Sequence, residues 1–409
     1  MERNAEESQQ ASPHIRPQHS KQTSIFLFFK RLFESRSHQF LPYLIEKIID
    51  SSSATRIFFI RSPRSLWQCC LKVWQACDNE LYNTLDKTKW TDYVLEGWRF
   101  NRRFARGVYL GIALVRLLET NNMLELSGLI KMPNEKRLRM RQLEAQEQYA
   151  LVMRCLDEDW RLDGQLKRGE LSTKAGVEFL ATEIAKMHQA LEASPNDIGT
   201  VEHIRDKLKF NTGLFERALR QLASNRFDTS EYWFIPERMK EGYKGCIKHF
   251  IQRFEANHIK RCHGDLKATN LWVQPEAVGF LELRKSPQQL LALDCVDFNP
   301  RFCHIDTLSD VAMLAIDIEV YLVDQLAESI QEETGKYPAG YFLETYLERV
   351  GEQSTEPIWA LLEYYMTEKA MICAYMSILY DKLPDLGQRY LNIALIHAHR
   401  LSDSLTSQL

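Results

Sequence analysis

The spacing of apolar residues along the chain changes near Gly169. Before this position, apolar residues form short runs bounded by turn residues, a pattern typical of β-strands. After it, they recur every three or four residues over long segments, as they do on one face of an α-helix. The sequence therefore predicts an α+β fold with a strand-rich front part and a helix-rich rear part.

The front part carries alternating signals for strands and helices. Apolar residues at 40, 41, 44, 45 and 48 predict a short helix over 39–50. The run Arg61-Ser62-Pro63-Arg64-Ser65 indicates a turn, and so predicts a hairpin between its flanking strands. In full, we expect strands at 56–60, 66–74, 108–115 and 150–153, and a second helix at 93–104.

The rear part is dominated by helical periodicity. Two short apolar runs, 271–273 and 290–293, interrupt it and predict a small β-ribbon embedded among the helices. Helices are expected at 172–191, 210–222, 239–256, 308–326 and 359–401.

The first residues differ from the rest in composition. Residues 1–22 contain almost no large apolar side chain, so we expect a disordered tail. The apolar run 25–29 is too short to span a membrane. It predicts a short helix packed on the body, with an interfacial anchor as the less favoured alternative. No apolar run is long enough for a transmembrane segment, and none is expected.

Charge and cysteine content narrow the function classes. A net charge of -3 argues against a nucleic-acid binder held by bulk electrostatics. The nine cysteines include no C-x-x-C pair, which argues against a zinc knuckle or a thioredoxin-type motif. We expect reduced thiols in a cytoplasmic protein. No partner protein is evident.

Candidate chemistry lies around the predicted ribbon. The segment from His263 to Asn270 has the H-x-D-x-x-x-x-N spacing of a kinase catalytic loop, with Asp265 at its centre. Asp294 ends the second ribbon strand. This order of residues predicts transfer of a phosphoryl group from ATP, a reaction in which the protein mainly positions the acceptor and neutralises charge.

Each residue type suits one part of that chemistry. Asp265 would accept the proton of the acceptor hydroxyl, and Asn270 and Asp294 would offer oxygens to Mg²⁺. Asp297, in Val296-Asp297-Phe298, is the second choice as a metal ligand. His263 is expected to brace the loop. The plainer alternative is a turn whose polar residues only satisfy backbone groups.

A cation and a carboxylate upstream could complete the nucleotide site. Lys72 ends a predicted strand, where its amine could reach the phosphates of ATP, and Glu96 on the following helix could hold it as an ion pair. The alternative is an edge-strand lysine that extends to solvent and a solvated glutamate. From the residues alone, neither interpretation is favoured.

Several stretches together resemble a bacterial family related to the aminoglycoside phosphotransferases, within the protein-kinase-like superfamily. The resemblance covers roughly residues 55–325. Its motifs are Glu96-Gly97-Trp98-Arg99-Phe100-Asn101-Arg102-Arg103, Tyr109-Leu110-Gly111, Met153 to Asp163, Gly169-Glu170-Leu171, Cys262 to Leu266, Asp294 to Asn299, Ile305-Asp306 and Ser309-Asp310.

The resemblance implies a protein-kinase-like two-lobed fold with ATP in the cleft. A small β-rich N-lobe with preceding helices would span 23–152, and a larger, mainly helical C-lobe 153–409. By position, Lys72 becomes the phosphate-contacting lysine with Glu96 as its partner, and Asp310 a carboxylate that braces the catalytic segment. The implied reaction moves the γ-phosphate of ATP, with Mg²⁺, to a hydroxyl of an unidentified small molecule.

The chain departs from the family pattern in three places. Lys267-Ala268-Thr269 replaces the usual His-Leu-Gly, and Lys267 could contact the γ-phosphate or point to solvent. The 61–65 turn lacks glycine, although Arg61 or Arg64 could attract phosphate. No G-x-x-x-x-G-K-[ST] loop occurs in the sequence, so we expect no counterpart of the P-loop domain that many relatives carry. An inactive nucleotide-binding scaffold is therefore the alternative function.

One acidic row remains. Asp310, Asp317 and Asp324 recur every seven residues, so they share one face of a predicted helix. A solvated face is the favoured interpretation, and a binding surface for a cationic acceptor is the alternative.

Overall fold

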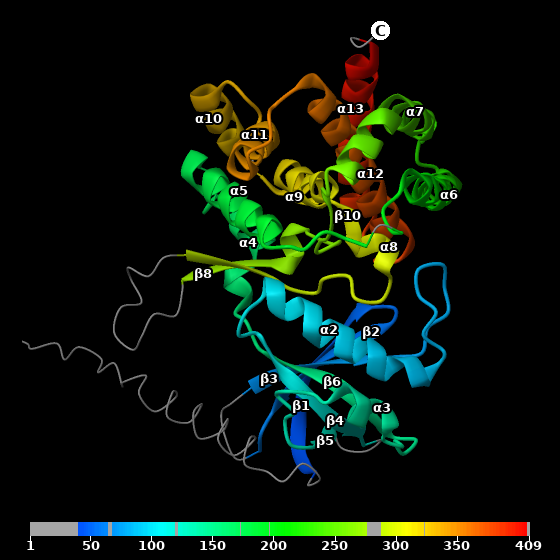
Figure 1. Ribbon diagram of the computed structural model, residues 1–409, viewed down its shortest axis with the longest axis vertical. Helices are drawn as coiled ribbons and strands as arrows, with labels where there is room; N and C mark the ends of the chain where they lie inside the picture. Colours follow the sequence, from blue (N-terminus) through cyan, green and yellow to red (C-terminus); the bar gives the residue numbers. More distant parts are fainter. Residues whose placement is uncertain are drawn as a thin grey trace, which may run out of the picture. The chain divides into compact units, whose positions relative to one another are not determined.

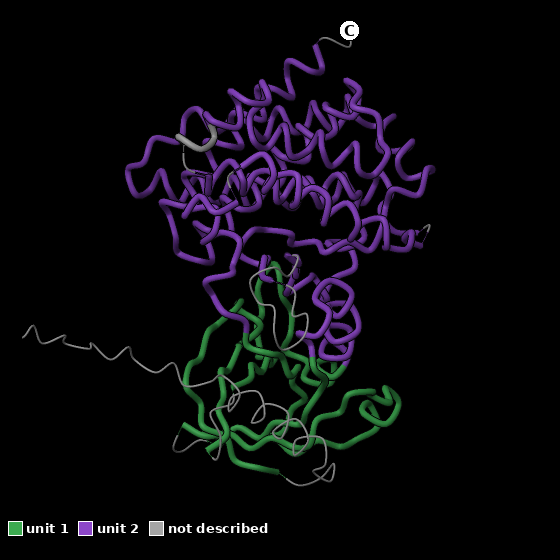
Figure 2. The backbone as a smooth tube through the Cα atoms, turned by 90° about the vertical axis from the view of Figure 1, so that its left-hand side faces the viewer, with its two compact units in different colours: residues 1–91, 110–155 green, residues 92–109, 156–409 purple. Residues whose placement is uncertain are grey.

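A computed structural model describes residues 40–63, 68–118, 122–171, 173–195, 197–275, 288–322 and 324–406, without the side chains of 324–327. The expected tail at 1–22, the run 25–29 and Arg64 lie outside these residues. The chain forms two compact units (Figure 2). The first comprises Met1–Thr91 and Leu110–Cys155, and the second Asp92–Tyr109 and Leu156–Leu409.

The first unit is built on a closed barrel with the strand order β1-β2-β3-β6-β4-β5 (Figure 1). Alternate residues of β3, namely Cys69, Leu71 and Val73, enter its apolar interior beside Phe58 and Ile60. A short helix, α3 (Glu135–Met140), precedes β6. The strands are β1 (Leu41–Ser52), β2 (Thr55–Arg61), β3 (Gln68–Trp74), β4 (Tyr109–Leu117), β5 (Met123–Leu126) and β6 (Glu147–Arg154).

The helix predicted at 39–50 is wrong. This segment is strand β1, which pairs antiparallel with β2 along most of its length and with β5 at its beginning. Its five apolar residues fit helical spacing, but none of them is buried, and the one buried side chain of β1 is Tyr43. Pairing with strands on both sides outweighs the weak local pattern. The strands expected at 56–60, 66–74, 108–115 and 150–153 are confirmed as β2, β3, β4 and β6, with β3 described from Gln68.

The second unit is mainly helical (Figure 1). Two antiparallel ribbons lie within it: β7 (Ile259–Arg261) pairs with β10 (His304–Asp306), and β8 (Leu271–Pro275) pairs with β9 (Gln288–Ala292). The β8–β9 ribbon was predicted and is confirmed; β7 and β10 were not predicted. The helices are α2 (Trp90–Phe104), α4 (Leu162–Lys167), α5 (Lys174–Gln189), α6 (Val201–Ser224), α7 (Phe234–Glu255), α8 (Pro300–Cys303), α9 (Thr307–Tyr321), α10 (Asp324–Thr334), α11 (Pro338–Val350), α12 (Glu356–Leu379) and α13 (Pro384–Thr406).

Helix α9 forms the centre of the second unit. Every residue of α9 except Glu319 is buried, and the helix packs against α11, α12 and α13. The helices expected at 93–104, 172–191, 210–222 and 239–256 are confirmed as α2, α5, α6 and α7. The segments 308–326 and 359–401 were each expected to be one helix, and each is broken into two.

The β-rich first unit and the helical second unit agree with the expected α+β class. The boundary expected at 152/153 stays a prediction. None of the helices in the described part of the chain is long and apolar enough to cross a membrane.

Candidate functional site

The predicted catalytic segment runs from the end of β7 to the start of β8, entirely within the second unit. Gly264 adopts a left-handed backbone conformation with a φ of 84°. A Cβ atom at this position would lie 2.7 Å from the carbonyl oxygen of Phe302. Only glycine tolerates both the conformation and the close approach, so Gly264 sets the path of the chain into Asp265.

Asp265 is held by two other residues of the segment. The Asn270 side-chain amide donates to the Asp265 carboxylate over 2.9 Å and to its backbone carbonyl over 3.0 Å. The Lys267 ammonium lies 3.0 Å from the same carboxylate oxygen. Attraction to Asp265 raises the pKa of Lys267 above its usual value. Lys267 therefore pairs with Asp265, which neither of its two expected orientations included.

Backbone hydrogen bonds place the start of the next segment beside this loop. The Leu293 N–H donates to the Asn270 carbonyl over 2.8 Å, and the Val296 N–H donates to the His263 carbonyl over 2.9 Å. The buried His263 ring donates from Nε2 to the Leu293 carbonyl over 3.0 Å. These bonds flank Asp294, which is thereby kept next to Asn270.

Asp294 itself has an unusual backbone. Its φ of 63° lies in the left-handed region, which a residue other than glycine adopts at some cost in energy. Two buried residues from the α2–β4 region stabilise it. The Asp294 N–H donates to the Tyr109 hydroxyl over 3.0 Å, and the Cys295 N–H donates to Asn101 Oδ1 over 2.9 Å. Tyr109 also donates to Asn101 over 2.9 Å.

The supporting roles of Asn101 and Tyr109 were not predicted. Both residues lie in motifs that carry the family resemblance, and that was the available signal. No local pattern indicates their partners, because Cys295 lies 194 residues beyond Asn101.

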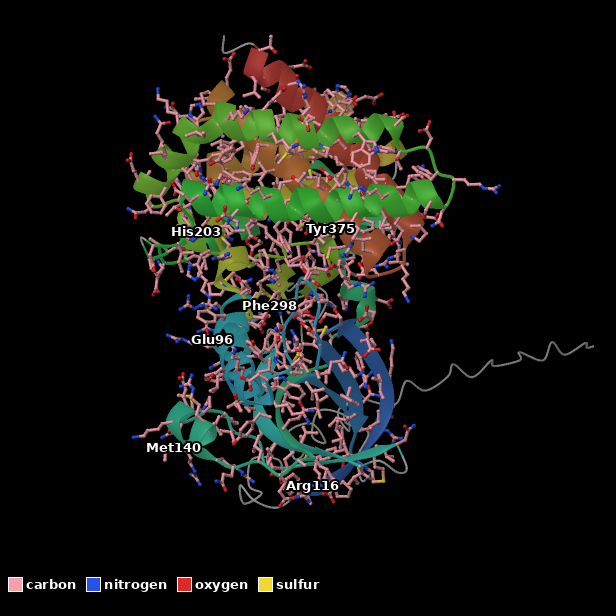
Figure 3. All side chains as sticks on the ribbon, turned by 90° about the vertical axis from the view of Figure 1, so that its right-hand side faces the viewer. Glu96, Arg116, Met140, His203, Phe298 and Tyr375 are labelled. Carbon is pink, nitrogen blue, oxygen red and sulfur yellow. The ribbon has the colours of Figure 1, made fainter. Side chains whose placement is uncertain are left out.

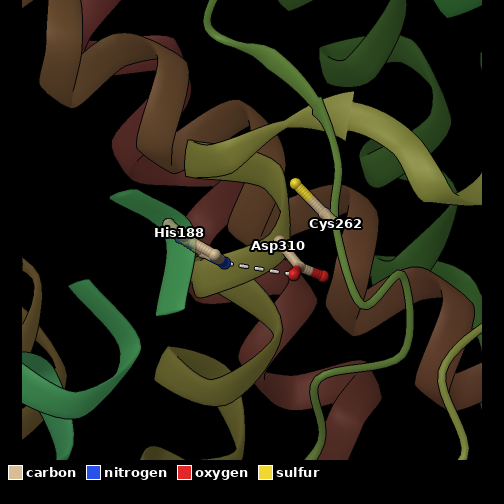
Figure 4. A group of neighbouring side chains, drawn as sticks. All are labelled: His188, Cys262 and Asp310. Carbon is tan, nitrogen blue, oxygen red and sulfur yellow. Dashed lines mark hydrogen bonds and ion pairs between the residues drawn. The ribbon is translucent and has the colours of Figure 1, made fainter. Parts of the chain in front are cut away.

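The fully buried Asp310 carboxylate holds the start of the segment. It accepts hydrogen bonds from the backbone N–H groups of His263 over 3.0 Å and Gly264 over 2.9 Å. His188 on α5 lies 3.2 Å from the same carboxylate, a partner that was not predicted (Figure 4). Burial alone would raise the pKa of Asp310, but the hydrogen bond and charge of His188 bring it below its usual value.

The cluster of His188, Cys262 and Asp310 resembles a metal site in composition (Figure 4). Its ligand atoms already have other roles. Both Asp310 oxygens accept backbone hydrogen bonds, and His188 Nδ1 lies 2.7 Å from the Tyr346 hydroxyl. Burial raises the pKa of Cys262 well above its usual value, so its thiol keeps the proton. We interpret the cluster as a hydrogen-bond network that braces the loop.

Asp317 lies two helical turns after Asp310 and is also fully buried. It accepts hydrogen bonds of 2.6 Å from the Ala268 N–H and 2.6 Å from the Tyr390 hydroxyl. Burial raises the pKa of Asp317 to about 6. The solvated face expected for this acidic row is therefore wrong for Asp310 and Asp317, because both carboxylates bind the predicted catalytic segment. The side chain of Asp324 lies outside the described part of the chain.

The other candidate residues are placed as follows. Lys72 is buried on β3 in the first unit. Glu96 lies on α2 (Figure 3) and belongs to the second unit. Because Lys72 and Glu96 belong to different units, their pairing stays a prediction. Glu96 lies 3.4 Å from Arg261. In the glycine-free turn, Arg61 pairs with Glu46.

Asp297, the second choice for a metal ligand, is buried, with 8% of its surface exposed. Its neighbour Phe298 is labelled in Figure 3. Phe298 packs on Phe302, whose carbonyl oxygen confines Gly264. The Val296-Asp297-Phe298 run is thus part of the packing beneath the loop. Asp294 is the better candidate for the residue beside Asn270, because the preceding residue, Leu293, is hydrogen-bonded to Asn270.

No protein-family model matches the chain, and no curated protein matches it in sequence. Among solved structures it is similar to a putative aminoglycoside phosphotransferase from Ralstonia eutropha JMP134, at 11% identity and a TM-score of 0.44, covering 93% of this chain and 98% of that one. A choline/ethanolamine kinase family protein from Mesorhizobium loti gives 11% identity and a TM-score of 0.43, covering 94% and 98%. For the Plasmodium vivax ethanolamine kinase the values are 10% and 0.40, with 87% and 81% covered. At these values none of them assigns the chain to a family.

Proposed function

We propose that the chain is an ATP- and Mg²⁺-dependent phosphotransferase that moves the γ-phosphate to a hydroxyl of a small-molecule acceptor. The observation that carries the proposal is the local convergence of Asp265, Asn270 and the Asp294 backbone in one unit. Asn270 donates to Asp265, and the Leu293 N–H donates to the Asn270 carbonyl, so the backbone directly before Asp294 contacts the loop although it is distant in sequence.

The donor set fits a hard divalent cation. Because the side-chain nitrogen of Asn270 donates to Asp265, its Oδ1 is the atom left to face a ligand. Asp294 adds a carboxylate from a backbone conformation that is costly for this residue type, as is common at functional sites. Amide and carboxylate oxygens are the ligands that Mg²⁺ uses in proteins. Bound there, Mg²⁺ would neutralise charge on the phosphates.

The remaining residues position the reacting groups. In this proposal, the Asp265 carboxylate accepts the hydrogen bond of the acceptor hydroxyl and takes its proton late in the transfer. Lys267 is paired with Asp265 and so places a positive charge beside the carboxylate that would accept the proton. His263 and Asp310 keep the loop in place through backbone hydrogen bonds. Lys72 and Glu96 complete the proposed nucleotide site.

A second candidate, an inactive nucleotide-binding scaffold, has one observation in its favour. The same Asp265 oxygen that would serve as the base accepts from Asn270 and pairs with Lys267. An acceptor hydroxyl would reach this oxygen only by displacing one of these two groups.

Thermal-shift titration with ATP, with and without Mg²⁺, tests binding, and ADP release across a library of hydroxyl metabolites tests turnover. We expect Asp265→Ala to retain Mg²⁺-dependent ATP binding while turnover falls by about a thousandfold, in line with the loss of a general base. Asp294→Ala should weaken ATP binding only when Mg²⁺ is present, and more than Asp297→Ala does.

Asp206→Ala, at an exposed carboxylate on α6, is the control and should behave as wild type. Turnover retained by the Asp265 variant would exclude Asp265 as the base. Binding without turnover on every acceptor would favour the scaffold.

A further inference from the structure

Two cysteines of the first unit lie in contact. Cys70 is on β3 and Cys155 directly follows β6, and their sulfur atoms are 2.9 Å apart. In the β3–β6 register Cys70 lies opposite Met153, so Cys155 is its diagonal neighbour on the same face. Because Cys155 lies past the end of the strand, its backbone is not held at the ladder spacing. A disulfide needs the sulfurs at about 2.0 Å, so closure requires only a small movement.

The Cys70–Cys155 pair differs in environment from Cys69, the neighbouring cysteine on β3. Cys155 is partly exposed, and the hydrogen bond with Cys70 lowers its pKa below the usual value. Cys69 instead enters the barrel interior, where burial raises its pKa. A thiolate is the reactive form of cysteine, so oxidation should begin at Cys155 and leave Cys69 unchanged.

We propose that Cys70 and Cys155 are a redox modification site, at which a hydroperoxide produces an intramolecular disulfide that lowers nucleotide affinity. The thiolate of Cys155 attacks a peroxide oxygen, the O–O bond breaks, and Cys155 becomes a sulfenic acid with release of water or alcohol. The Cys70 sulfur then attacks the Cys155 sulfur, the S–O bond breaks, and water leaves. The two thiols lose two electrons and two protons, which the peroxide takes up.

The effect on nucleotide rests on the proposed function. Cys69, Leu71 and Val73 face the barrel interior, so Cys70 and Lys72 share the opposite face of β3. The disulfide would tie this face to the last residue of the first unit, because the chain enters the second unit at Leu156. The bond would fasten the strand that carries Lys72 to Cys155 and so restrict the adjustment of Lys72 to phosphate. We expect ATP affinity to fall several-fold on oxidation.

The bond itself is tested on the full chain without any assay of activity. The reduced protein is titrated with hydrogen peroxide, remaining thiols are alkylated, and peptides are mapped by mass spectrometry without reduction. We expect a linked Cys70–Cys155 peptide, lighter by two hydrogen atoms, which disappears on adding dithiothreitol. Cys70→Ser and Cys155→Ser should abolish it. Cys77→Ser, at a partly exposed thiol outside the pair, is the control and should leave it unchanged.

Oxidation of Cys155 to sulfinic acid with Cys70 still alkylatable would overturn the site. The nucleotide effect is then measured by ATP titration of the reduced and linked forms. Equal affinities would overturn the regulatory part. If the reduced protein binds no ATP, the proposed function fails, and the peptide map still decides whether the disulfide forms.

Discussion

At the scale of single residues, the candidate site depends on a few buried groups that hold backbone in place. Asp310 is the clearest case, since it accepts hydrogen bonds from two consecutive N–H groups at His263 and Gly264. Each of these groups, if left unpaired in the interior, would cost about 1–3 kcal/mol. Asp310 therefore both stabilises the segment and limits where Asp265 can lie.

The sequence predicted those parts of the site that depend on local spacing. Asp265 and Asn270 are five residues apart, and their contact follows the loop motif. The partners Asn101 and His188 could not be found in this way. Asn101 reaches Cys295 across 194 residues, and His188 reaches Asp310 across 122. An asparagine or a histidine has no identifiable partner in the sequence alone, because the fold decides which distant segment it contacts.

Gly264 gives a prediction at this scale. Gly264→Ala should remove the proposed activity and lower the free energy of unfolding by about 2–4 kcal/mol, because Cβ would meet the Phe302 carbonyl in a left-handed conformation. Urea unfolding and ADP release measure the two effects.

Gly213→Ala is the matched control for Gly264→Ala. Gly213 lies within α6, and a Cβ there meets nothing within 4 Å. This substitution should raise stability by about 0.5–1 kcal/mol, since alanine favours the helix. An equal loss in both variants would show that the Gly264 conformation is not the cause.

At the scale of elements, α9 is the support of the proposed catalytic segment. Asp310 and Asp317 are separated by about two turns, or roughly 10 Å along one helix face. Asp310 binds the start of the segment, and Asp317 binds it at Ala268. A single rigid helix thus fixes both ends of a loop that has little regular structure of its own.

Helices and strands were predicted correctly where a segment's own apolar pattern is strong. The prediction failed where pairing with neighbouring strands determines the structure. The long apolar period of α7 and the short runs of β8 and β9 identify those elements. The 39–50 segment has helical spacing but becomes β1, because β2 and β5 supply its hydrogen bonds. Helix α12 ends at Leu379 and α13 begins at Pro384, a residue favoured at the first position of a helix. The apolar spacing continues across this break and so did not indicate it.

Asp317 gives a prediction at the element scale. Asp317→Ala leaves the Ala268 N–H and the Tyr390 hydroxyl without their acceptor, so stability should fall by about 2–4 kcal/mol and turnover by more than tenfold. Tyr390→Phe removes only the second bond and should cost about 1 kcal/mol with little change in turnover. Urea unfolding and steady-state kinetics of both variants separate the two contacts. Equal turnover in both would argue against α9 as the support of the loop.

At the scale of the whole molecule, the change in apolar spacing predicted a β-rich front and a helical rear, and both are present. The spacing of apolar residues did not indicate that residues 92–109, which include most of α2, belong to the second unit. The reason lies in contacts of high sequence separation, since Asn101 and Tyr109 bind the 294–295 backbone. Unit membership follows from such contacts and is not a property of local pattern.

Buried titratable groups make the stability of the molecule depend on pH. His397 on α13 is fully buried, with its ring nitrogens 2.6 Å from Glu363 on α12 and 3.0 Å from Glu319 on α9. Burial alone would lower the pKa of His397, but the charges and hydrogen bonds of these glutamates raise it to about 9. Three central helices are therefore joined by one imidazolium that carries a charge in the folded state at neutral pH.

The sign of the pH dependence follows from the two states. In the unfolded chain the pKa of histidine is about 6.5, so the stabilisation by His397 is complete below this pH and is lost as pH rises towards 9. A shift of this size corresponds to roughly 3 kcal/mol. Denaturant unfolding at pH 6, 7, 8 and 9 should therefore show falling stability in the wild type and a much flatter profile in His397→Gln. His399→Gln, an exposed neighbour on the same helix, should keep the wild-type slope. If the His397 variant retained that slope, the ion-paired imidazolium would not be its source.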